Sequence, residues 1–63
     1  MDLNFEQAEK MISAQRKDEL ARLLWQGNPL PENLTAIEKI FAFGLYTFIE
    51  YEDKQQLKNY FLE

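Results

Sequence analysis

Three carboxylates that lie close together in the sequence, Glu50, Glu52 and Asp53, are the densest group of side chains that could do chemistry. Carboxylates can serve as general acids and bases or as metal ligands, but only where they converge on one point. On a helix, Glu50 and Asp53 lie near each other, whereas Glu52 points to another side. The spacing therefore predicts a solvated acidic face with Glu50 paired to Lys54, and no metal site. A recognition patch for a basic surface, built on Glu50 and Asp53, is the alternative.

Catalysis has little support in the residue types that are present. The chain contains neither histidine nor cysteine, the side chains best suited to general base and nucleophilic chemistry at neutral pH. A glycine-rich phosphate-binding loop is also missing from the sequence. We therefore expect a protein that is not an enzyme and that uses no cofactor.

The charge pattern bears on nucleic acid as a partner. The net charge of −4 repels a phosphate backbone, so only a local basic surface could bind it. The basic residues of the first half alternate with acidic ones, which is typical of a solvated helix face of mixed charge. The alternative is a dimer of helical hairpins that doubles these basic residues and binds nucleic acid as a regulator. They are Lys10, Arg16, Lys17 and Arg22.

A membrane span is not expected. The longest apolar run, residues 40–49, is about half as long as the roughly 20 residues that a spanning helix needs. Residues 1–10 are acidic and lack the apolar segment of a secretory signal, which favours a cytoplasmic protein.

Turn and cap residues divide the chain into helices. Both prolines and Gly27 fall in the segment 26–33, which predicts a loop. Before it, Asn4 as an N-cap and Gly27 as a C-cap residue predict helix one over about 5–26. After it, the capping-box pair Thr35 and Glu38 predicts helix two over about 36–52.

The apolar pattern slips in phase at two places. Segment 13–19 has Ala14 as its only apolar residue, so helix one is either continuous or kinked near 13–18. A second slip near Asp53 predicts a separate C-terminal helix over about 54–62. The prediction is one small all-α domain over 1–63, a helical hairpin followed by a short helix.

Helix two carries more apolar residues than one neighbouring helix can cover. A single antiparallel helix shields only part of its circumference, and a chain this short buries only about 60% of the surface it exposes when unfolded. We therefore predict a homodimeric helical bundle. The alternative is a compact monomer in which helix one breaks and wraps around helix two. The predicted dimer-interface residues are Phe41, Gly44, Leu45 and Phe48.

The function that fits these features is protein–protein interaction. We expect a small acidic regulatory or adaptor protein of the inhibitor or modulator type, with an unidentified protein as partner. The alternatives are the nucleic-acid regulator and a structural subunit of a larger assembly. Trp25 is assigned first to closing the core at the loop and second to partner contact. The partner-binding candidates are Trp25, Phe43, Tyr46, Glu50, Asp53 and Tyr60.

Overall fold

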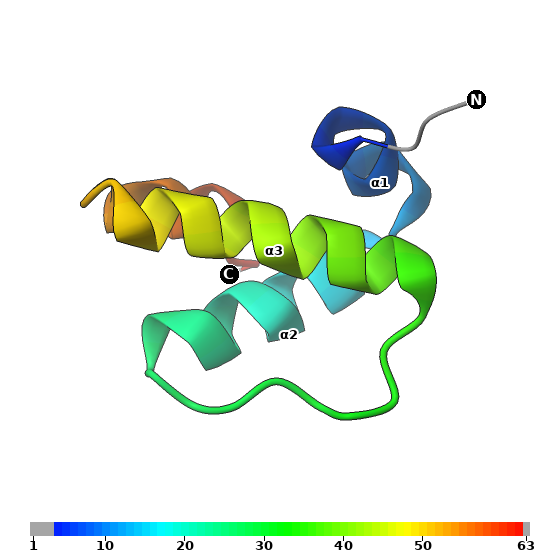
Figure 1. Ribbon diagram of the computed structural model, residues 1–63, viewed down its shortest axis with the longest axis horizontal. Helices are drawn as coiled ribbons and strands as arrows, with labels where there is room; N and C mark the ends of the chain where they lie inside the picture. Colours follow the sequence, from blue (N-terminus) through cyan, green and yellow to red (C-terminus); the bar gives the residue numbers. More distant parts are fainter. Residues whose placement is uncertain (1–3, 63) are drawn as a thin grey trace.

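The structure is all-α, as the sequence predicts. The computed structural model describes residues 4–62, and no strand occurs within that range. Three α-helices are followed by one 3-10 helix (Figure 1). Their bounds are α1 Phe5–Met11, α2 Ala14–Trp25, α3 Ala36–Glu50 and η1 Lys54–Tyr60.

Helix α3 lies at the centre of the arrangement. It runs along the molecule, with α1 on one side, α2 on the other and η1 alongside (Figure 1), and it contacts all three. The 3-10 helix also packs against α2. Coverage of α3 therefore comes from three short segments of the same chain, as in the compact alternative, and not from one long antiparallel helix.

The predicted first helix is interrupted at Ile12 and Ser13. Both residues have extended backbone, and Ser13 caps α2 by accepting a 3.1 Å hydrogen bond from the Arg16 backbone N–H. The interruption turns α1 away from α2 and brings Ile12 into the core. The break thus falls at the beginning of the predicted interval 13–18. The rest of that interval lies inside α2.

The predicted caps of the other helix ends form. The side chain of Asn4 accepts from the Gln7 N–H at 2.9 Å. Thr35 and Glu38 make both hydrogen bonds of a capping box, at 3.1 and 2.9 Å. Gly27 takes a left-handed conformation (φ 77°) after α2, where backbone bonds to Leu23 and Leu24 complete a Schellman motif.

Helix α3 ends at Glu50, two residues earlier than predicted. The N–H groups of Glu52 and Asp53 donate to the carbonyls of Ile49 and Phe48, again as a Schellman motif. This motif requires a left-handed residue, and here it is Glu52 (φ 59°). The C-terminal helix that follows is a 3-10 helix rather than an α-helix. Asp53 precedes it and makes no side-chain capping bond to it.

The left-handed Glu52 offers a simple stability test. We expect Glu52→Gly to raise the free energy of unfolding by about 0.5–1 kcal/mol, because glycine adopts this conformation without the steric penalty of a side chain. Chemical denaturation of the purified variant measures the change. Gly27→Ala is the matched opposite change at the other Schellman motif and should lower stability. Equal stability of Glu52→Gly and the parent would show that Glu52 is not strained.

The core is built around α3. Its largest fully buried side chains are Phe41, Leu20, Leu45 and Leu57, contributed by α2, α3 and η1. Phe41 stacks on Phe5 of α1, with 5.4 Å between ring centroids, and meets the edge of Tyr60 at 5.1 Å. Aromatic contacts through Phe41 thereby join both α1 and η1 to α3.

The predicted dimer-interface residues are used inside the chain. Phe41 and Leu45 are fully buried, while Gly44 and Phe48 are partly covered, with Phe5 packed against both. An interface centred on these four residues would require the core to open. A dimer that leaves this core closed would have to use another surface of the molecule.

Candidate functional site

The exposed side of α3 carries two large aromatic side chains. Phe43 is 62% exposed and Tyr46, one turn later, is 39% exposed. The helical wheel places both away from the main apolar face of α3, together with Ala42 and Ile49. The latter two are buried and half-buried in the structure. We call this side the outer face of α3; it consists of Lys39, Phe43, Tyr46, Thr47 and Glu50, all of them exposed.

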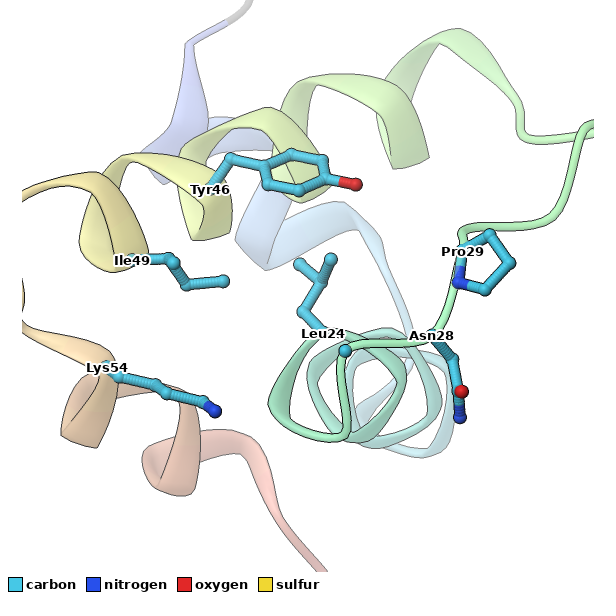
Figure 2. A pocket seen from close by; sticks show the side chains of 7 residues that line it. Leu24, Asn28, Pro29, Tyr46, Ile49 and Lys54 are labelled. Atoms are coloured by element: carbon cyan, nitrogen blue, oxygen red, sulfur yellow. The ribbon is translucent and has the colours of Figure 1, made fainter.

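A pocket of about 480 Å³ adjoins the outer face. Figure 2 shows Tyr46 and Ile49 of α3 on one side, Leu24 and Pro29 on the other, and Lys54 closing one end. Its wall is mainly apolar, and the loop after α2 forms one rim. The sequence predicts a binding role for Tyr46 but does not indicate the pocket, because the loop position depends on tertiary packing.

Lys54 is held by an aromatic ring rather than by a carboxylate. Its ammonium lies 4.8 Å from the centroid of the Trp25 ring, and that of Lys58 lies 4.9 Å from it. The predicted ion pair of Glu50 with Lys54 does not form within residues 4–62, because α3 stops at Glu50 and Lys54 begins η1 in a new direction.

Trp25 closes one end of the molecule. Its half-buried ring packs against the core and meets Phe61 edge-on at a centroid distance of 5.8 Å. With two lysines also over the ring, Trp25 is engaged within the chain. Its position fits the core-closing assignment better than partner contact.

Tyr60 is likewise occupied within the chain. It is half-buried, and its hydroxyl donates a hydrogen bond to the carboxylate of Glu9 on α1. Burial, followed by the neighbouring Glu9 carboxylate, raises the pKa of Tyr60 above its ordinary value. The side chain therefore stays protonated and joins η1 to α1, which leaves little of it for a partner.

The acidic candidates stay at the surface. Glu50 and Asp53 are both exposed, and neither forms an ion pair within the described part of the chain. Between residues 4 and 62, no group of three or more acidic side chains is placed to hold a metal ion. Glu50 lies beside the aromatics of the outer face and gives that face an acidic edge, whereas Asp53 lies beyond the end of α3.

Most of the basic residues proposed for nucleic-acid binding are already paired. Each pair draws a basic side chain toward a carboxylate, which lowers the local positive potential. Lys17 alone among the four has no acidic partner within residues 4–62. The pairs are Lys10–Glu6 (3.8 Å), Arg16–Glu38 (2.6 Å), Arg16–Glu19 (3.0 Å) and Arg22–Asp18 (2.7 Å).

Two of these carboxylates also accept backbone hydrogen bonds. The Thr35 backbone N–H donates to Glu38 and lowers its pKa. The Arg16 guanidinium, which also donates to this carboxylate, contributes a smaller lowering. The Leu62 backbone N–H donates to Asp18 at 2.8 Å and lowers its pKa, and the Arg22 side chain contributes a smaller lowering. The first contact set joins α2 to the start of α3, and the second holds the C-terminal segment on α2.

These depressed pKa values predict acid-sensitive stability. Because each carboxylate binds protons more weakly when folded, its contribution is present above its unfolded pKa and is lost as pH falls through the folded pKa. We expect the free energy of unfolding to decrease from about pH 5 to about pH 3. Urea denaturation across this range measures it. Glu38→Gln should reduce the dependence of the free energy of unfolding on pH. Glu32→Gln, at an exposed loop position, is the control and should leave that dependence unchanged. An unchanged dependence in Glu38→Gln would contradict the assignment.

No helix within residues 4–62 combines the length and apolar character needed to cross a membrane. Comparison of the chain with protein-family models, curated proteins and solved structures finds no match.

Proposed function

We propose that the chain is a small regulatory or adaptor protein that acts by binding another protein through the outer face of α3 and the adjoining pocket. The observation that carries this proposal is Phe43, a phenylalanine 62% exposed in the middle of the central helix. The core already has fully buried apolar side chains from α1, α2, α3 and η1. Phe43 is therefore not needed to complete it.

The arrangement has the parts of a protein-binding surface. Large aromatic side chains beside a pocket are typical anchors of interfaces, and the surrounding charged residues form a rim that sets orientation. Here Phe43 and Tyr46 supply the aromatic area, and the pocket of about 480 Å³ can receive a side chain of the partner. The exposed Glu50 and, beyond the end of α3, the exposed Asp53 supply negative charge. A partner with an apolar side chain flanked by basic residues complements this surface best.

The other function classes have less support. Nucleic-acid binding would need the basic residues that the ion pairs occupy. Catalysis would need a general base or nucleophile beside the pocket, and the pocket offers Tyr46 and Lys54 but no carboxylate. We therefore propose a binding protein without enzymatic activity.

Site-specific photocrosslinking tests the proposal. A photoreactive phenylalanine at position 43, in the chain expressed in its native host, should crosslink to a distinct second protein identified by mass spectrometry. The same residue at Gln15, an exposed position of α2, is the control and should not yield that product. Identical products from positions 43 and 15, or none from position 43, would count against the outer face as a binding site.

Alanine variants measure the aromatic contribution to the same interaction. Phe43→Ala and Tyr46→Ala should each weaken partner binding by more than about 1 kcal/mol, as interface anchors do, while circular dichroism shows an unchanged helical fold. Loss of the fold instead would assign these residues to the core. Charge reversal at Glu50 and Asp53 tests the acidic edge, and unchanged affinity would remove it from the proposal.

A further inference from the structure

The outer face of α3 is complementary to itself. Phe43 and Tyr46 lie one on each side of the midpoint between Gly44 and Leu45, and Lys39 and Glu50 lie farther out about the same midpoint. If a second α3 runs antiparallel across this midpoint, Phe43 faces Tyr46 of the other helix and Lys39 faces its Glu50. Each contact then occurs twice, as a two-fold axis requires.

From this symmetry we propose that, when no other protein occupies it, the outer face binds a second copy of the chain through an antiparallel α3 pair. The inference uses the same face as the proposed function. It is tested on the purified chain alone, however, so either can fail without the other.

The charges support this occupant independently of the aromatics. Lys39 lies near the beginning of α3 and Glu50 is its last residue, so both are placed against the preference of the helix dipole for acidic N-terminal and basic C-terminal residues. Neither forms an ion pair within residues 4–62. An antiparallel second copy brings the opposite charge to each of them and places the positive end of each helix dipole beside the negative end of the other.

Helix-packing geometry fixes the form of the contact. Lys39 and Glu50 lie about 8 Å along the axis from the midpoint, at 1.5 Å per residue. At a crossing angle near 20° the helices stay close enough over this length for the long charged side chains to meet, whereas near 50° they diverge. The inferred dimer is therefore a shallow-angle pair. In the view of Figure 1 no other element crosses in front of α3.

The outer face is short, which limits the expected affinity of the dimer. Helix α3 is about 22 Å long at 1.5 Å per residue, so the buried area is near or below the low end of stable interfaces, about 1,200 Å². We expect reversible dimerisation that depends on protein concentration and that light scattering or sedimentation equilibrium detects over a roughly hundredfold range.

Charge exchange provides the decisive test. Lys39→Glu alone and Glu50→Lys alone should each weaken dimerisation roughly tenfold, because each turns two attractive contacts into two repulsive ones. The double variant Lys39→Glu/Glu50→Lys should restore dimerisation. The matched control exchanges the surface pair of α1, Glu6→Lys/Lys10→Glu, and should leave it unchanged. Circular dichroism of each variant confirms that the monomer is folded.

Two results would overturn the inference. A parent chain that stays monomeric over the whole range, while the crosslinking experiment still yields a different protein, would reject the second copy and leave the proposed function standing. If the double charge exchange fails to restore dimerisation, self-association uses another face. The same conclusion follows if the dimer persists in Phe43→Ser.

Discussion

Phe41→Ala should leave the chain largely unfolded at 25 °C. Phe41 is fully buried and contacts the rings of Phe5 and Tyr60, so it joins α1, α3 and η1. Truncating a buried phenylalanine typically costs about 3–5 kcal/mol. A core in a chain of this size, with no disulfide, rarely supplies more than about 3–5 kcal/mol in total. The loss therefore equals most or all of the stability.

Circular dichroism during thermal unfolding measures this outcome. Phe43→Ala provides a matched control, because it removes the same side chain from the same helix at a position that is 62% exposed. The control should change stability by less than about 0.5 kcal/mol, the usual range for surface substitutions. A Phe41→Ala variant that keeps a cooperative transition near the parent's melting temperature would show that the aromatic contacts do not hold these helices together.

Local signals predicted three capped helix ends correctly. The Asn4, Thr35 and Gly27 caps form as expected because their hydrogen bonds join residues only a few positions apart. Such bonds depend on the local sequence more than on the rest of the fold. The phase slip near Asp53 is also local, and the left-handed Glu52 produces it.

Two features of the fold could not be predicted from the sequence because they depend on contacts between residues far apart in the chain. Whether helix one would break at Ser13 depends on Arg16 reaching Glu38, 22 positions away, and on α1 packing against α3. The helical pattern correctly grouped Phe41 and Leu45 on one apolar face, but it could not tell whether the covering surface belongs to the same chain or to another. In the structure, the same chain covers them.

The candidate site was predictable only in part. The helical wheel placed Phe43 away from the main apolar face, and the structure confirms its exposure. It treated Ile49 in the same way, yet this side chain packs against the core and lines the pocket. The pocket itself joins α2, the loop and α3, so no single periodic segment could indicate it.

Gly44→Ala should destabilise the chain even though alanine is the better helix former. Gly44 lies in the middle of α3, where glycine costs about 1 kcal/mol relative to alanine. The ring of Phe5 occupies the space of the missing side chain, because an added Cβ would lie 2.5 Å from Phe5 Cε1 and 2.9 Å from its Cγ. Overpacking of this kind typically costs about 1–3 kcal/mol. Chemical denaturation should therefore show a net loss of stability.

A second substitution separates the gain in helix propensity from the cost of overpacking, because the two change stability in opposite directions. In a Phe5→Leu background the ring is gone, so Gly44→Ala should cost less or become stabilising by up to about 1 kcal/mol, the helix-propensity gain. The two sites interact directly, so the double-mutant cycle should give a coupling energy well outside the roughly 0.3–0.5 kcal/mol seen for independent sites. An equal loss in both backgrounds would mean that Phe5 does not pack on Gly44. Helix α1, only seven residues long, would then depend on its other contacts, such as buried Ala8 and the hydrogen bond that Glu9 accepts from Tyr60.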